Sequence, residues 1–175
     1  MKNTLLRYSD MLYLACIWLS GGAIFAMSLI IPWGIFTRYV LGTGSQWPEP
    51  VSILLMVIFT FFGAAAAYRA GSHIAVAMVT DRMPRVLQRL CAQLVHILMF
   101  AVAIFMLIYG SKLCQETWGQ NIGEIPWMPV GATYLPVPLG GLVTLVFILE
   151  HVLLGSQHNR TVVTFDHAVE EAEAL

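Results

Sequence analysis

The stretch MLYLACIWLSGGAIFAMSLIIPWGIFT, residues 11–37, contains no charged side chain over 27 residues. A helix needs about 20 mostly apolar residues to cross a hydrocarbon core of roughly 30 Å, so this stretch is long enough to span a bilayer. It is also longer than the core of a signal peptide, which has roughly 7–15 apolar residues. The stretch therefore predicts an uncleaved first transmembrane helix.

Three more windows without charged residues follow along the chain. The 175 residues are 58% hydrophobic and 11% charged, whereas soluble globular domains average about 45–50% and about 25%. We therefore predict an all-α membrane protein with four transmembrane helices and a short cytoplasmic amphipathic helix. The spans are expected at about residues 11–32, 50–69, 87–110 and 131–154.

The Lys and Arg residues near the span ends predict the orientation, because positively charged loops stay in the cytoplasm. With four spans, both termini and the middle loop share one side of the membrane. That side carries seven of the nine Lys and Arg residues, so we expect both termini to be cytoplasmic. Residues 1–155 are predicted to form the membrane domain, and residues 156–175 a cytoplasmic acidic tail.

Prolines and glycines predict local irregularities. Pro32 lies in the long first window and predicts a kink, or a change into an interfacial segment that runs to Tyr39. Apolar residues interspersed with polar ones over residues 74–83 predict the amphipathic helix. A distorted outer end and close packing of the fourth span are predicted from Pro136, Pro138, Gly140 and Gly141.

Ionisable side chains inside a membrane usually mark ion or proton pathways, and the sequence places none well inside a span except His96. With Gln93 one turn earlier, His96 predicts a polar contact to another helix or subunit, and a neutral, hydrogen-bonded histidine is favoured over a proton relay. Cys/His clusters at zinc spacing, nucleotide loops and catalytic triads are absent from the sequence. We therefore expect no enzyme activity and no catalytic, cofactor or metal site. The net charge of −1 gives no indication of a nucleic-acid partner.

Two other classes of membrane protein remain as alternatives. A stand-alone four-helix small-molecule exporter would need an acid embedded in the membrane, but Glu49 and Glu150 fall at span ends. A haem-binding membrane anchor subunit would need two histidines at facing depths in two spans. Only His96 lies well inside a span, since His73 and His151 are expected at span ends.

Short motifs between residues 38 and 84 indicate a family. They are Arg38-Tyr39, Trp47 with Glu49, Gly63-Ala64, Arg69 with Gly71, His73-Ile74 with Val76, and Arg82-Met83-Pro84. In this order they resemble the small membrane subunit (the Q subunit) of tripartite ATP-independent periplasmic (TRAP) transporters. Two positions depart from the usual pattern of that family, in which acids are common there: Pro50 and Ala77.

The resemblance implies the small permease subunit of a sodium-coupled, binding-protein-dependent secondary transporter for organic acids in the bacterial inner membrane. Its implied partners are the lipid bilayer, a large membrane subunit that holds the sodium and substrate sites, and a periplasmic substrate-binding protein. We expect this chain to be a scaffold for the large subunit and to help dock the binding protein. The candidate contact residues are Arg38, Tyr39, Trp47, Glu49, His73, Arg82, Glu124 and Trp127.

Two features of the outer side leave alternatives open. Arg38 and Glu49 lie at adjoining span ends, where they form either a partly buried ion pair or two separately solvated charges. Residues 47–50 and 119–129 form the outer loops that a soluble partner would meet. Trp47 and Trp127 in these loops fit either docking of that partner or anchoring at the lipid headgroups.

Overall fold

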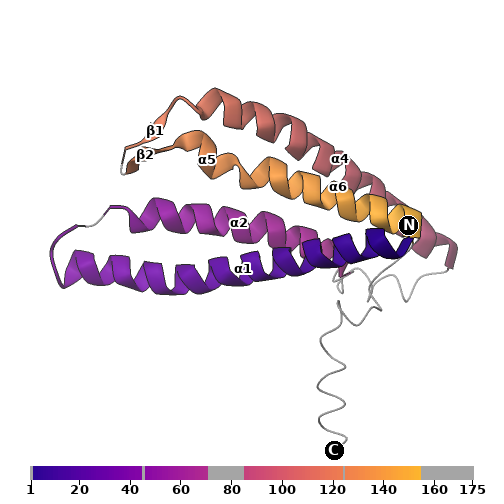
Figure 1. Cartoon of the computed structure of the whole chain (residues 1–175), viewed down its shortest axis with the longest axis horizontal. Coiled ribbons are helices and arrows are strands. Elements are labelled where there is room, and N and C mark those ends of the chain that lie inside the picture. The colour runs from indigo at the N-terminus through magenta and orange to yellow at the C-terminus, as the bar shows by residue number, and fades with distance from the viewer. Residues whose placement is uncertain (1, 45, 71–84, 124, 155–175) are drawn as a thin grey trace, which may run out of the picture.

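Four long helices form two antiparallel pairs, as the computed structural model in Figure 1 shows. One pair consists of α1 (Lys2–Tyr39) and α2 (Pro48–Arg69), and the other of α4 (Arg85–Thr117) and α6 (Pro136–Leu154). Contacts between α2 and α6 join the two pairs. The structure describes residues 2–44, 46–70, 85–123 and 125–154.

The bundle has two ends, which we name by the segments found there. The terminal end holds the start of α1 and the end of α6, and the loop end holds the α1–α2 turn and a small antiparallel hairpin (Figure 1). The strands of this hairpin are β1 (Asn121–Ile122) and β2 (Ile125–Pro129). The two helix pairs lie close together toward the terminal end and diverge toward the loop end.

The described chain contains four regions long and apolar enough to cross a membrane. They confirm the predicted all-α membrane class, because the charge-free windows fall on them. Two helices extend well past their predicted spans: α1 runs from Lys2 to Tyr39, and α4 continues to Thr117. The amphipathic helix predicted at residues 74–83 lies outside the described residues.

α1 continues as a helix through Pro32 to Tyr39, and the kink or interfacial position expected after Pro32 stays a prediction. A proline removes one backbone donor from a helix. In lipid, a helix still satisfies all the other backbone groups of the segment, so continuing it costs less than leaving it. The 38 residues of α1 correspond to a length of about 57 Å at 1.5 Å per residue.

The outer part of the fourth span is interrupted, as its prolines predict. A five-residue helix, α5 (Val130–Tyr134), precedes α6, and Leu135 separates the two. Further along, a Cβ atom added at Gly140 would lie 2.7 Å from Cβ of Phe61 in α2. A Cβ atom at Gly141 would lie 3.0 Å from the carbonyl oxygen of Ala103 in α4. The two glycines therefore let α6 pack closely between α2 and α4, which confirms the predicted close packing.

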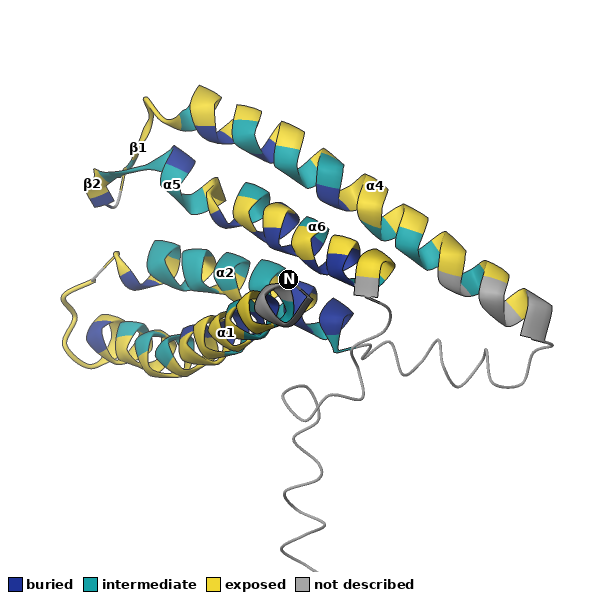
Figure 2. Ribbon diagram, turned by 45° about the vertical axis from the view of Figure 1, so that its right-hand side comes forward, coloured by how far each residue is buried: buried dark blue, intermediate teal, exposed yellow. Residues whose placement is uncertain are grey.

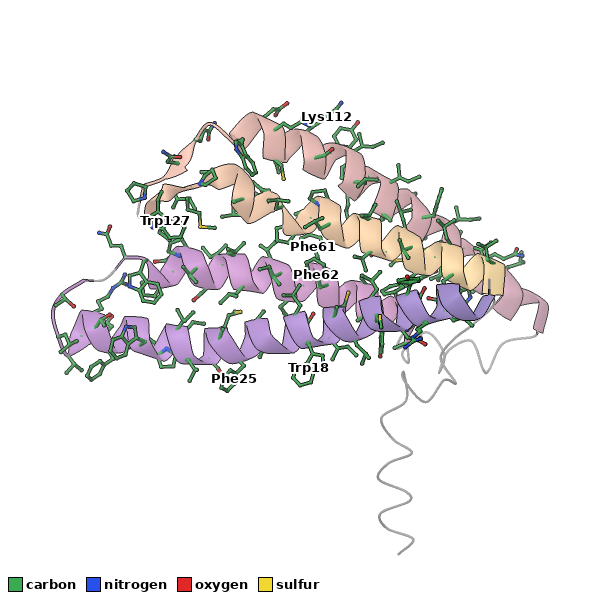
Figure 3. All side chains as sticks on the ribbon, viewed as in Figure 1. Trp18, Phe25, Phe61, Phe62, Lys112 and Trp127 are labelled. Atoms are coloured by element: carbon green, nitrogen blue, oxygen red, sulfur yellow. The ribbon has the colours of Figure 1, made fainter. Side chains whose placement is uncertain are left out.

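Burial follows this arrangement (Figure 2). α6 is the most buried of the four spans, and residues from all four helices pack at the core, among them Cys16, Ala65, Ala103 and Phe147. Large apolar side chains cover the outward faces of α1 and α4 instead. Trp18 and Phe25, for example, point away from the bundle (Figure 3).

The turn between α1 and α2 depends on glycine. Gly42 and Gly44 have φ values of +63° and +57°, which side chains with a Cβ atom rarely adopt. Pro48 then opens α2, a position where its missing N–H is not needed by the helix. This turn places the end of α1 beside the start of α2 at the loop end.

Candidate functional site

A buried group of ionised side chains lies at the terminal end and connects three helices. Arg69, near the end of α2, donates from Nε and Nη2 to the two carboxylate oxygens of Glu150 in α6, each at 2.8 Å. Its Nη2 also donates to Oδ1 of Asp10 in α1 at 2.6 Å. The side chains of Arg69 and Glu150 are each 2% exposed. Both charges are therefore enclosed by protein.

Aromatic rings flank the guanidinium of Arg69. Its Cζ lies 5.1 Å from the ring centroid of Tyr13 and 5.5 Å from that of Phe147. Cations are attracted to the faces of such rings, more strongly where water is excluded. Within the described residues, Nη1 of Arg69 is buried and has no hydrogen-bond partner. The two rings therefore add electrostatic attraction to that of the carboxylates of Glu150 and Asp10.

A second polar contact adds α4 to this end of the bundle. The hydroxyl of Tyr68 in α2 lies 2.8 Å from Nδ1 of His96 in α4, and the rings of His96 and His151 are 4.3 Å apart between centroids. This confirms the expected contact of His96 with another helix. We call Asp10, Tyr68, Arg69, His96, Glu150 and His151 the terminal polar cluster.

The terminal polar cluster lies at span ends, where the sequence placed Glu150, but Arg69 and Glu150 are enclosed there by protein. Asp10, Arg69 and Glu150 all fall in the regions able to cross a membrane. Charges in such a position are stable only when they are paired, and a bidentate arginine–carboxylate contact is the strongest pairing that side chains offer. Each charge stands at the edge of a charge-free window, and the sequence alone did not predict that the three come together.

The cluster is suited to fixing helices rather than to binding a solute. Nε and Nη2 of Arg69 donate to the two carboxylate oxygens of Glu150, and both side chains are shielded from solvent. The histidine rings touch, which leaves no room for a haem between them. In the described part of the chain there is also no group of three His, Cys, Asp or Glu residues that could hold a metal ion.

The predicted contact residues divide by position. Arg38, Tyr39, Trp47, Glu49 and Trp127 lie at the loop end and are exposed, with 80% exposure for Tyr39 and 83% for Trp127. The remaining three lie outside the described residues: His73, Arg82 and Glu124. The structure thus gathers five candidates at one end of the bundle, and the role of all eight stays a prediction.

Arg38 and Glu49 lie near each other but do not form the ion pair that was one of the two alternatives from the sequence. They line the same groove between α1 and α2. Every ion pair in the described residues involves Arg69, and none joins Arg38 to Glu49. At this end of the bundle the two charges remain available to other groups.

The fold and the enclosed cluster define a multi-pass helical membrane protein whose polar groups hold its helices together. Comparison with known families gives the particular one. The model of the DctQ component of tripartite ATP-independent periplasmic transporters matches residues 27–158. The chain belongs to this family, the small permease subunits of TRAP transporters, as its motifs indicated.

Individual relatives agree with this assignment. A TRAP transporter small permease protein of Haemophilus influenzae is 21% identical over 127 residues, covering 73% of this chain and 78% of its own length. The sialic acid TRAP transporter small permease protein SiaQ of Vibrio cholerae is 24% identical, with coverage of 74% and 78%. The ectoine TRAP transporter small permease protein TeaB of Halomonas elongata is 25% identical, with coverage of 63% and 58%.

Proposed function

We propose that this chain is the scaffold of its transporter in the bacterial inner membrane, with both termini in the cytoplasm. In this proposal a large membrane subunit packs against it and carries out transport, while a periplasmic protein supplies the substrate. The small subunit itself catalyses no reaction and binds no cofactor. The excess of Lys and Arg on one side supports the orientation.

The observation that carries the proposal is the contrast between the inside and the outside of the bundle. The paired charges of Arg69 and Glu150 are enclosed, and large apolar side chains cover the outer faces of α1 and α4. On α4 these side chains include Leu94, Phe100 and Phe105. An apolar outer face of this kind can be covered by lipid or by the helices of a larger subunit.

The transported substrate is proposed to be an organic acid, moved by the large subunit together with sodium. Support comes from the relatives, whose names include sialic acid and ectoine, both of which carry a carboxyl group. The enclosed polar groups of this chain give a second argument. Coupling to an ion requires polar atoms that the ion can reach, and Arg69 and Glu150 are shielded from solvent.

Reconstitution of the complex tests the scaffold role. The large TRAP membrane subunit of the same organism would be placed in liposomes with the periplasmic protein, with and without this chain. This chain alone would be placed in a further set of liposomes. Uptake of a panel of labelled organic acids would then be measured under a sodium gradient. We expect uptake only when all three proteins and sodium are present. Full uptake without this chain would refute the scaffold role, and uptake by this chain alone would support a stand-alone transporter.

Docking of the periplasmic protein is proposed to occur at the loop end. Trp127 is 83% exposed there, and exposed aromatic residues frequently dominate protein interfaces. Trp127→Ala should raise the concentration of binding protein needed for half-maximal uptake while the membrane complex assembles normally. Trp118→Ala is the control, because Trp118 is also exposed near this end. An unchanged concentration dependence would leave Trp127 only an anchoring role at the headgroups.

A further inference from the structure

A groove of about 600 Å³ lies between α1 and α2 near the loop end. Its volume is within the range of about 300–1,000 Å³ that is typical of small-molecule sites. The wall consists largely of apolar side chains from both helices, namely Met27, Ile31, Ile35, Ile53 and Met56. Gly34 and Pro48 also line it, and a Cβ atom at Gly34 would lie 3.0 Å from Cβ of Pro48. The helices therefore touch at this point, and the groove follows their contact.

The groove changes from apolar to polar toward the loop end. Arg38 and Glu49 line it there, and the same two residues line an adjoining hollow of about 360 Å³ together with Gln46. Arg38 and Glu49 bring opposite charges to the same opening without forming an ion pair with each other. A ligand that fits would carry an apolar chain and, at its end, groups of both charges.

The length of the groove matches one leaflet of a membrane. Its lining residues on α1 run from Met27 to Tyr39, which corresponds to about 18 Å at 1.5 Å per residue. One leaflet contributes about half of a hydrocarbon core of roughly 30 Å, or about 15 Å. An acyl chain that lay along the apolar wall would therefore end near the membrane surface, where the two charges are.

We propose that this groove binds a phospholipid whose headgroup carries a primary ammonium, as in phosphatidylethanolamine. An acyl chain lies along the apolar wall, the phosphate accepts hydrogen bonds from the guanidinium of Arg38, and the ammonium donates to the carboxylate of Glu49. A phosphatidylglycerol headgroup has no cation for Glu49. A phosphatidylcholine headgroup has a cation without N–H donors. The charges of the groove thus select among lipids that share the same chains.

Native mass spectrometry of the full-length chain, purified with its large subunit, tests this proposal. The complex would be incubated with phosphatidylethanolamine, phosphatidylglycerol and phosphatidylcholine of identical chains, and the retained lipid measured. We expect phosphatidylethanolamine to be retained in preference to the other two. Arg38→Gln and Glu49→Gln should each lower its retention by about twofold to fivefold, the range for a partly exposed charge contact.

Matched variants keep the test specific. Lys112→Gln and Glu116→Gln remove an exposed cation and an exposed anion from the loop-end half of α4, and they should leave retention unchanged. Ile31→Trp should reduce retention of all three lipids by filling the groove without touching a charge. If a variant fails to fold, the comparison of headgroups on the unaltered chain still decides.

Two results would overturn the proposal. One is equal retention of the three headgroups by the unaltered complex. The other is efficient crosslinking of a cysteine introduced by Ile31→Cys to the large subunit, since this would show that a partner helix fills the groove. Preferential retention of phosphatidylethanolamine that disappears in Arg38→Gln would support it.

Discussion

Arg69 connects parts of the chain that are far apart in the sequence, since its partners lie 59 and 81 residues away. The sequence identified Arg69 as a motif residue and a topology determinant but not as a buried one. Local spacing could not reveal its partners, because they belong to other helices. A usable indication did exist: Asp10 and Glu150 border the first and fourth windows on the side of the membrane where Arg69 follows the second. Acidic and basic residues that are predicted at the same depth of the membrane can be tested as candidate ion-pair partners.

Removing Arg69 should strongly destabilise the bundle. Arg69→Ala leaves the enclosed carboxylate of Glu150 without its partner, and breaking a buried pair in this way costs about 3–5 kcal/mol. The free energy of unfolding of the purified chain in detergent, measured by chemical denaturation, gives the result directly. Arg38→Ala is the control and should change it by less than about 0.5 kcal/mol, because Arg38 is exposed and outside any ion pair among the described residues.

A double-mutant cycle separates pairing from mere loss of side-chain volume. Arg69→Met combined with Glu150→Gln should be less destabilised than the sum of the two single changes, by roughly 0.5–3 kcal/mol. The reason is that the double variant removes both members of the enclosed Arg69–Glu150 pair. Losses that simply add would contradict a direct interaction of the two residues.

Tyr68 provides a second test at the residue scale. Tyr68→Phe removes the hydroxyl that lies 2.8 Å from Nδ1 of His96, and the loss of one such hydrogen bond should cost about 0.5–1.5 kcal/mol. Tyr134→Phe is a suitable comparison, because Tyr134 is exposed and should tolerate the change. An equal effect of both variants on the free energy of unfolding would show that the Tyr68–His96 contact adds no stability.

At the scale of the elements, the sequence predicted helices well and their interruptions unevenly. The four predicted spans all became helical, with a break at Leu135 in the fourth, because length and apolarity decide whether a segment can cross lipid. Prolines were less reliable guides. Pro32 left α1 continuous, whereas the segment before Pro136 broke into α5 and α6. Whether a proline interrupts a helix depends on the contacts that neighbouring helices make at that position. The sequence does not show those contacts.

Helix packing gives a prediction at the same scale. Gly140→Ala would place a methyl group 2.7 Å from Cβ of Phe61, and such overpacking typically costs about 1–3 kcal/mol. Gly21→Ala is the matched control, since a Cβ atom there would meet nothing within 4 Å and alanine favours helix by up to about 1 kcal/mol. The expected order of unfolding free energies is therefore Gly21→Ala at or above the unaltered chain and Gly140→Ala below it. Equal stability of the two would contradict close packing of α2 and α6.

For the whole molecule, we expect both termini to face the cytoplasm. Alkaline phosphatase fused after Gln157 should be inactive, because that enzyme works only outside the cytoplasm. The same enzyme fused at Gly123, beside the hairpin, should be active. The reverse pattern would contradict the orientation derived from the Lys and Arg residues.

The candidate site shows the limit of sequence reasoning for this molecule. The loop-end candidates were chosen from motifs, and five of the eight do lie together at one end. The terminal polar cluster was missed, apart from the contact of His96 with another helix, because its members come from four helices. A charge beside an apolar window could face water or protein. Only the arrangement of the helices decides between these environments.

The divergence of the two helix pairs toward the loop end has a consequence for the surrounding membrane. A body that is narrow at one surface and broad at the other occupies unequal areas in the two leaflets. Lateral pressure would then act on this chain with a different force in each leaflet, so we expect its stability to depend on the intrinsic curvature of the lipids as well as on their thickness.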